Sequence, residues 1–192
     1  MSNIDKTKIG EVVDATVTRG AGQEDNLTTA GVYTAKCYAA DGSLKWSDTF
    51  HNLITNEGRA NMLNVYLGNF AAGPIVMGLK GAGTASINDT QASHASWLEL
   101  GSINAPTYSG TRKTPNFSSA TIASPSVKTT STAAVFTMTS SGTVTGAFIN
   151  ANGSAVIGDT SGILFSAGDF TAGSKTVTSG DTINVTYQLS AS

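Results

Sequence analysis

The sequence predicts an all-β fold: an antiparallel β-sandwich or jelly roll with one short helix and an extended N-terminal arm. Composition is the first indication, because 27 Thr and 22 Ser outnumber the 24 charged residues. Threonine favours strands, whereas serine and glycine favour turns. The second indication is the alternation of apolar and polar residues in several short segments, and the third is the frequency of turn signals between them. Together they predict about nine or ten short strands.

The chain divides into an arm, residues 1–30, and a β-sandwich domain, residues 31–192. The arm is the most polar stretch and contains a glycine-rich break at residues 20–22. Its candidate partner-binding residues are the apolar side chains of Ile4, Ile9, Val12 and Val13. Two interpretations remain open, an arm that extends along a partner and a simple floppy terminus.

Residues 31–51 are predicted to form a β-hairpin. Apolar or small residues alternate with polar ones in its first strand, at Tyr33, Ala35, Cys37 and Ala39. Asp41-Gly42 follows, a pair favoured in tight hairpin turns because both positions tolerate positive φ. Leu44 and Trp46 then begin a second alternating strand.

Residues 55–68 are predicted to form the helix, of about three turns. Thr55 or Asn56 can cap its first amides, and Glu57 suits the positive end of the helix dipole. Apolar residues recur at helical spacing at Ala60, Met62, Leu63, Tyr66 and Leu67. Gly68 is expected to end the helix in the left-handed conformation. We therefore expect this apolar stripe to plug the underside of a sheet.

The remaining chain is predicted to be strands and turns. The short strands are residues 75–77, 97–100, 162–165 and 182–189. Residues 135–149 are predicted to form a second hairpin around the turn at 140–142. Residues 102–131 contain three of the four prolines and are expected to hold loops or edge strands.

Several classes of partner and ligand are disfavoured by composition. A net charge of −2 and a pI of about 5.6 are unlike a nucleic-acid binder, whose Lys and Arg cluster. The chain has no run of about 18 apolar residues that would predict a membrane helix, and no signal peptide is visible. A single cysteine, Cys37, predicts inert packing and no internal disulfide. With only two histidines and one cysteine, we expect no metal site, and we expect no cofactor. The lack of a signal peptide and of disulfides predicts assembly in the cytoplasm of the bacterial host.

Candidate catalytic residues have simpler interpretations. His51 and His94 are the available bases for a catalytic triad, but no nucleophile-elbow motif is present. We interpret both histidines as polar residues at strand ends. Carboxylates that would suit glycoside hydrolysis or calcium binding are spaced at Asp159, Asp169 and Asp181. Each follows a glycine, so a role in a turn is favoured.

Two further features resemble binding motifs only superficially. Residues 78–84 are glycine-rich, but they lack the Gly-Lys-Ser/Thr of a phosphate loop, so a flexible turn is predicted. Trp46 and Trp97 have rings that could stack on sugars. Their positions in alternating strands predict anchoring in the core instead.

Low charge favours a protein that contacts other subunits. Charged residues are 24 of 192, about half the ~25% that is usual, and 20 of them precede residue 129. The C-terminal third is therefore nearly neutral. Because interface cores are depleted in charge, we expect contacts between copies there.

Three segments together resemble a family of virion proteins of tailed bacteriophages. The first runs from Gly31 to Gly68 and the second from Asp89 to Trp97. The third combines residues 144–148 with residues 179–187, and residues 1–30 fall outside the match.

The resemblance implies a non-enzymatic structural protein of the phage particle. Such proteins are small β-sandwiches, often homotrimers, that decorate or cement the capsid shell. The expected partners are the major capsid protein, or another virion protein, and further copies of the chain, and the expected location is the virion. A tail- or neck-associated protein is the alternative, and a glycan-binding or glycan-cleaving module is a third possibility.

Overall fold

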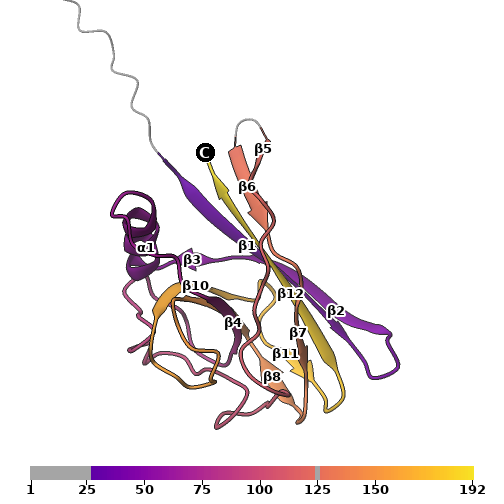
Figure 1. Ribbon diagram of the computed structural model, residues 1–192. Helices are drawn as coiled ribbons and strands as arrows, with labels where there is room; N and C mark the ends of the chain where they lie inside the picture. The colour runs from indigo at the N-terminus through magenta and orange to yellow at the C-terminus, as the bar shows by residue number, and fades with distance from the viewer. Residues whose placement is uncertain (1–26, 124–125) are drawn as a thin grey trace, which may run out of the picture.

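The structure is a computed structural model that describes residues 27–123 and 126–192. It is mostly β, with antiparallel sheets and one short helix, as the sequence predicts (Figure 1). The candidate arm residues Ile4, Ile9, Val12 and Val13 lie outside the described residues.

The largest sheet has six strands, in the order β2-β1-β12-β6-β5, with β7 also paired to β12. Its strands are β1 (Thr29–Tyr38), β2 (Leu44–His51), β5 (Thr121–Ala123), β6 (Ser126–Thr130), β7 (Ala134–Thr137) and β12 (Thr182–Ala191). The first strand begins at Thr29, two residues before the predicted domain, because Thr29 and Ala30 pair with the end of β12.

Two smaller sheets complete the fold. The four-stranded sheet has the order β3-β10-β9-β4, and the two-stranded sheet pairs β11 with β8. Their strands are β3 (Leu53–Ile54), β4 (Ile75–Lys80), β8 (Gly142–Val144), β9 (Gly146–Ala151), β10 (Ile163–Asp169) and β11 (Lys175–Val177).

Strand β12 lies at the centre of the six-stranded sheet, and its alternation is confirmed. Ile183, Val185 and Tyr187 are buried, and the residues between them face away from the core. The residues of β1 paired opposite them are Cys37, Ala35 and Tyr33, also fully buried. Cross-strand pairs of this kind stabilise a sheet by side-chain contact, as in the Tyr33–Tyr187 pair, whose ring centroids are 4.6 Å apart.

One apolar core joins the sheets. Strand β4 contributes Met77 and Leu79, β9 contributes Ile149, and the six-stranded sheet contributes Phe50 and Phe136. All five side chains are buried. The two larger sheets therefore contribute apolar side chains to the same interior. Strands β1 and β12 of the six-stranded sheet have one buried and one more exposed face, whereas all six residues of β9 are buried, because a second apolar cluster that includes Trp97 and Phe148 also packs there.

The first hairpin is confirmed, with a turn that differs in detail from the prediction. Gly42 has a φ of 84°, whereas Asp41 does not adopt positive φ. Asp41 instead accepts hydrogen bonds from the amide and hydroxyl of Ser43, at 2.9 and 2.6 Å. The connection between the two strands, residues 39–43, is longer than a two-residue hairpin turn, and the pairing register shifts beside it, between Cys37 and Tyr38. Asp41 thus closes the turn through its side chain.

The predicted second hairpin in residues 135–149 is wrong. Strand β7 pairs with β12, β8 pairs with β11, and β9 pairs with β10 and β4. The turn at 140–142 therefore carries the chain from one sheet to another. The predicted strand at residues 97–100 is also wrong: in it, only Glu99 makes a ladder contact, an isolated bridge to Lys80.

Helix α1 (Asn56–Tyr66) begins as predicted, with the Thr55 side chain accepting a hydrogen bond from the Gly58 amide at 3.0 Å. The plug that we expected is wrong, because Gly58 is the buried residue within this fully described helix. A side chain at that position would collide with the Phe165 carbonyl in β10. The helix thus touches the sheet through a glycine, and its apolar stripe faces outward. The left-handed residue after the helix is Asn69, and not Gly68 as predicted.

Candidate functional site

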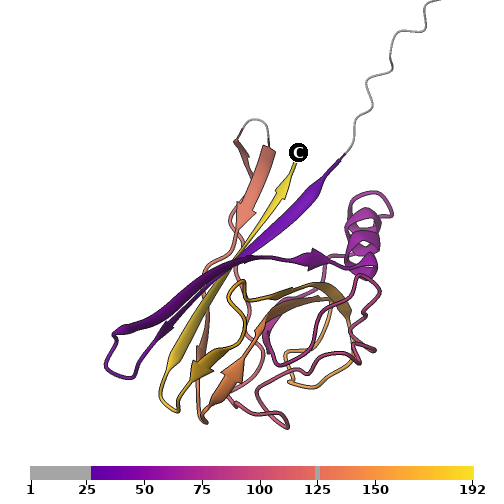
Figure 2. The same cartoon turned by 180° about the vertical axis from the view of Figure 1, so that it is seen from behind.

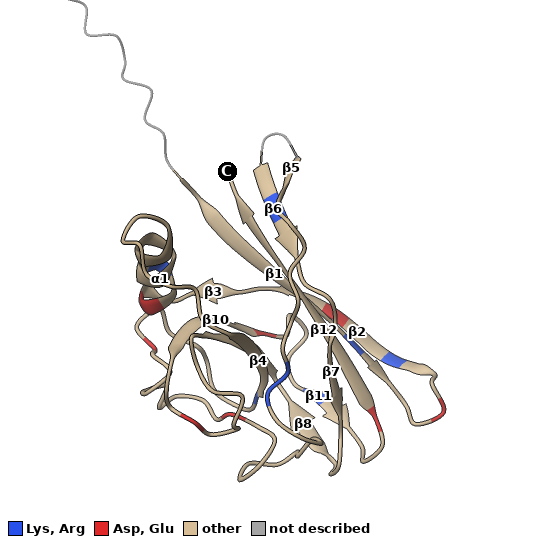
Figure 3. Cartoon of the chain, in the orientation of Figure 1, with Lys and Arg blue, Asp and Glu red and all other residues tan. Residues whose placement is uncertain are grey.

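Uncharged polar side chains dominate the outer surface of the six-stranded sheet, where Lys36 is paired with Asn184 and Lys128 with Ser190. The residues of β12 and β1 that face away from the core include Thr34, Thr182, Asn184, Thr186 and Gln188. We call these five residues the neutral face. Lys36 is an exposed charge among them, and Figure 3 shows the charged positions of this sheet on β1, β2 and β6. A neutral, regular β surface costs little to desolvate, which suits contact with another protein.

An apolar groove lies beside one end of this sheet, between α1 and the ends of β1, β6 and β12. Figure 2 shows these strand ends projecting beyond the body of the fold, with α1 beside them. The groove has a volume of about 780 Å³. Its large apolar side chains are Leu27, Met62, Leu63, Tyr66, Leu67, Val127 and Leu189.

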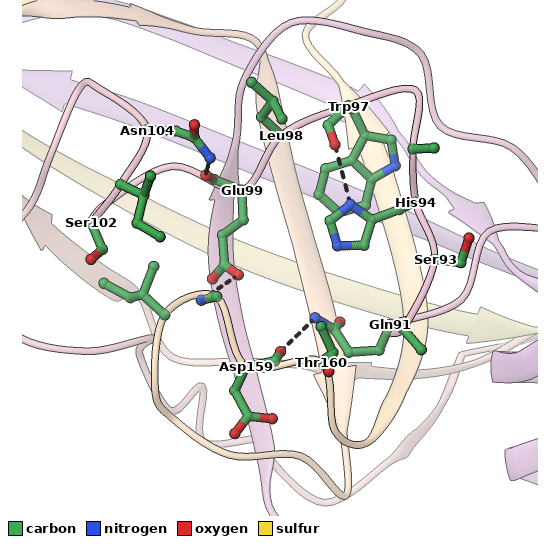
Figure 4. Close-up of a pocket in the computed structure, with 15 residues that line it drawn as sticks. Gln91, Ser93, His94, Trp97, Leu98, Glu99, Ser102, Asn104, Asp159 and Thr160 are labelled. Atoms are coloured by element: carbon green, nitrogen blue, oxygen red, sulfur yellow. Dashed lines mark hydrogen bonds between the residues drawn. The ribbon is translucent and has the colours of Figure 1, made fainter.

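A smaller, polar pocket of about 380 Å³ lies on another part of the molecule (Figure 4). Loop residues 91–95, 97–99, 102–104 and 157–160 line it. Behind its wall, Arg112 forms a two-pronged ion pair with Glu99, with both N–O distances 2.7 Å. The Gly158 amide donates to the same carboxylate at 2.9 Å. These contacts join the loops that form the pocket, so they hold its shape.

The aromatic wall of this pocket is also built from mutual contacts. The His94 ring stacks on Trp97, with centroids 4.0 Å apart, and Trp97 in turn packs on Phe148 at 5.3 Å. Trp97 Nε1 donates to Asp89 at 2.9 Å. Only 2% of Trp97 is exposed, so its ring faces are occupied by protein. Core anchoring of Trp97, as predicted, is confirmed; Trp46 is half-buried and packs against Phe170.

Two of the candidate catalytic residues, His94 and Asp159, line the same polar pocket (Figure 4). His51 is exposed at the end of β2 as predicted, whereas His94 lies in a loop and not at a strand end. Asp159 lies in a turn, where hydrogen bonds from Ser161 lower the pKa of its carboxyl. The described residues contain no cluster of three His, Cys, Asp or Glu side chains that could hold a metal ion.

The other two carboxylates each pair with a lysine. Asp169 ends β10 and forms an ion pair with Lys80. Asp181 is 2% exposed and pairs with Lys45 at 2.5 Å. Each carboxylate thus has its own structural partner.

Sequence reasoning missed the buried charges. Gly78, Leu79 and Lys80, predicted to lie in a flexible turn, belong to β4, and Lys80 is fully buried. The Lys80 ammonium also donates to the Gly83 carbonyl and lies 5.8 Å from the Trp97 ring centroid. A lysine among glycines carries no local signal of burial, because its partner Asp169 is 89 residues away in sequence.

Asp181 is a buried carboxyl whose charge is stabilised by hydrogen bonds. Burial raises the pKa of this carboxyl, but hydrogen bonds from Lys45 and Thr178 outweigh burial and hold the pKa below the ordinary value of 3.8. Its charge also adds to burial in raising the pKa of the Cys37 thiol to about 11. The folded state therefore favours an ionised Asp181 beside a protonated Cys37.

We expect the advantage of the native chain over Asp181→Asn in free energy of unfolding to depend on pH. Because folding lowers the pKa of Asp181, its ionised carboxylate stabilises the folded state. This contribution to the free energy of unfolding is fully present well above pH 3.8 and is lost as the pH falls through the folded-state pKa. Urea unfolding of both chains at a series of pH values from neutral to acid measures this difference. Lys45→Met is the matched control and should weaken the dependence. A difference that stays constant down to the lowest pH would contradict this role.

Comparison with known proteins gave no further assignment. No family model, no curated protein and no solved structure matches the chain. Within residues 27–123 and 126–192, no helix has the length and apolar character needed to cross a membrane.

Proposed function

We propose that the protein is a non-enzymatic structural protein of a tailed-bacteriophage particle, a decoration or cement protein that binds the outside of the capsid shell. In this proposal the two larger sheets form a β-sandwich of the jelly-roll type, and copies associate as homotrimers on the virion. The neutral face is the observation that carries the proposal. The resemblance of the three sequence segments supplies the phage context.

The chemistry of the neutral face supports contact between proteins. Its threonines pair with neighbouring strands, as in the Thr34–Thr49 hydroxyl contact at 3.2 Å. Gln188 likewise donates to Thr130 at 3.1 Å. Side chains held in place by such pairs lose little conformational entropy when a partner covers them. Association through this face therefore needs no large rearrangement.

The residues that carry the resemblance have structural roles. Asp89 binds the Trp97 indole and the Ser86 amide, at 2.9 and 2.8 Å. Tyr33, from the first segment, meets Tyr187, from the third. These residues therefore pack and hydrogen-bond within the fold. This is what we expect if the chain shares its fold with the phage structural proteins that it resembles.

The proposed mechanism is mechanical. Copies bind where neighbouring molecules of the major capsid protein meet, and each bound copy links adjacent shell subunits. The surface buried in these contacts raises the free energy needed to separate the subunits. The arm residues Ile4, Ile9, Val12 and Val13 are candidates for the contact with the shell or with a neighbouring copy.

The proposal is tested with purified protein and shells of its phage that lack it. We expect Thr186→Glu to weaken self-association and shell binding at least about tenfold, because a carboxylate on the neutral face must be desolvated. Analytical ultracentrifugation and co-sedimentation with shells measure the two effects. Thr111→Glu places the same charge on an exposed loop and is the matched control. Native chain that fails to co-sediment with shells would contradict the proposal.

Two other outcomes identify the alternatives. Quantitative mass spectrometry of intact particles gives the copy number. A number close to that of the shell subunits supports decoration, whereas a single ring of copies indicates a tail or neck protein. Binding to a host polysaccharide that is lost with Asp159→Asn would instead indicate a glycan module.

A further inference from the structure

We propose that the apolar groove is the docking site for the N-terminal segment of the same chain, with Ile9, Val12 and Val13 as the side chains that enter it. The described side of this contact is the groove, and the docked segment lies within residues 1–26. This inference concerns the free protein and goes beyond the proposed function.

The groove brings several exposed large apolar side chains together. Leu63 is 58% exposed, Tyr66 is 86% and Leu67 is 82% on the helix side. Leu27 is 75% exposed and Val127 is 41% on the sheet side. Contiguous apolar patches of this kind mark sites where another segment binds.

The charges of the groove favour an acidic occupant. Its charged lining residues are Arg59 and Lys128, and no carboxylate lines it. Among the described residues, none of the ion pairs includes either of these cations. A segment that carries acidic groups beside apolar ones would satisfy the cations while it covers the apolar wall.

The N-terminal segment has this composition. Ile9, Val12 and Val13 are spaced closely, and Glu11 and Asp14 lie among and beside them. The whole of residues 1–26 is net acidic, with five carboxylates against three cations, Lys6, Lys8 and Arg19. Its apolar residues can cover the wall of the groove while the two carboxylates approach Arg59 and Lys128. No other stretch of the chain outside the described residues is long enough, since the second gap is residues 124–125.

The segment can also reach the groove of its own chain. Leu27 itself lines the groove, and residues 14–26 connect it to Val13. Those 13 residues have a root-mean-square span of about 20 Å as a flexible chain, while the 11 residues of α1 span only about 16 Å. The glycine-rich stretch at 20–22 lets the chain reverse direction at low cost.

A tether of this length favours the same chain over a second copy. Short flexible linkers give an effective concentration in the millimolar range, far above the concentration of free protein in solution. Closing so short a loop costs little additional entropy. Binding to the shell through the same apolar residues would then first require their release from the groove.

Disulfide trapping in the full-length chain tests the proposal. The test variant combines Gly10→Cys with Tyr66→Cys, and the control combines Gly10→Cys with Ile103→Cys. Tyr66 and Ile103 are 86% and 93% exposed, so neither change removes core packing. Ile103 lines the polar pocket and not the groove. Cys37 is buried and does not compete.

We expect the test pair to form an intrachain disulfide at least about tenfold faster than the control pair under mild oxidation. Adding Val12→Asp and Val13→Asp should reduce the rate to that of the control. Mass spectrometry of a mixture of ¹⁴N- and ¹⁵N-labelled chains separates intrachain from interchain bonds.

Two results would overturn the proposal. Mixed-isotope disulfides would show that the groove takes the segment of a second copy. Equal rates for the two pairs would show that the segment does not occupy the groove. Neither result bears on shell binding, so failure here is distinguishable from failure of the proposed function.

Discussion

Replacing Arg112 by alanine is expected to lower the free energy of unfolding by about 3–5 kcal/mol, the cost of leaving one charge of a buried pair without its partner. The Arg112 side chain is fully buried and that of Glu99 is 6% exposed. Arg112 also donates to the carbonyls of Ser154 and Asp159, at 3.0 and 2.7 Å. Its removal therefore leaves the Glu99 carboxylate without its ion-pair partner and the two carbonyls without these hydrogen bonds. Urea unfolding followed by circular dichroism measures the loss.

A double variant separates the charge from the packing. Arg112→Met with Glu99→Leu removes both charges and keeps much of the side-chain volume, so we expect it to be less destabilising than Arg112→Ala alone. Lys36→Ala removes an exposed cation and serves as the control, with an expected change within about 0.5 kcal/mol. If the double variant were the least stable of the three, the ion pair would be contributing net stability.

Replacing Trp97 by alanine is expected to cost about 3–5 kcal/mol, because truncation of a buried aromatic residue leaves a cavity. The lost contacts are the stack with His94, the packing on Phe148 and the hydrogen bond to Asp89. Thermal and urea unfolding measure the effect. The same loss would remove an aromatic wall of the polar pocket.

Two matched variants show which contact matters. Trp97→Phe keeps a ring and removes the hydrogen bond to Asp89, so we expect a loss of about 1–2 kcal/mol. Trp46→Ala removes a half-buried indole at the edge of the sheet and should cost less than Trp97→Ala. Equal losses for Trp46→Ala and Trp97→Ala would contradict the anchoring role of Trp97.

Strands that have one wet and one dry face were predictable from sequence. The alternation at Ile183, Val185 and Tyr187 has the period of two that such a strand requires. The first hairpin was predictable for the same reason, with Asp41-Gly42 marking its turn. In both cases the alternation lies within about ten residues of sequence, which form a single strand in the structure.

Strand partners were not predictable in the same way. The residues around 140–142 satisfy the local pattern of a hairpin, yet β7 and β8 pair with β12 and β11. Local sequence specifies that a strand forms and which face is apolar, but the partner is chosen by packing over long sequence separation. The choice of β12 as the partner of β7 is of this kind.

Sequence predicted least well which charged side chains are buried and which apolar side chains are exposed. Lys80 and Arg112 are buried beside carboxylates that lie 89 and 13 residues away in sequence. The residues next to each cation in the sequence give no signal of these pairings. Leu63 and Tyr66 follow a helical stripe that normally predicts burial, yet Gly58 is the residue that meets β10. A helix that packs through a glycine leaves its apolar stripe free for another contact.

Because β12 is at the centre of the six-stranded sheet, this sheet cannot form until β12 has been synthesised. Strand β1 is made early, but Thr29 pairs with Ala191. The pairing between β1 and β12 therefore cannot be complete until residue 191 has been synthesised. Until β12 has been made, the edge of β1 that pairs with it has no partner in this sheet. Because sheets with such distant pairings form slowly, we expect this edge of the β1–β2 hairpin to be open to pairing with other chains during folding.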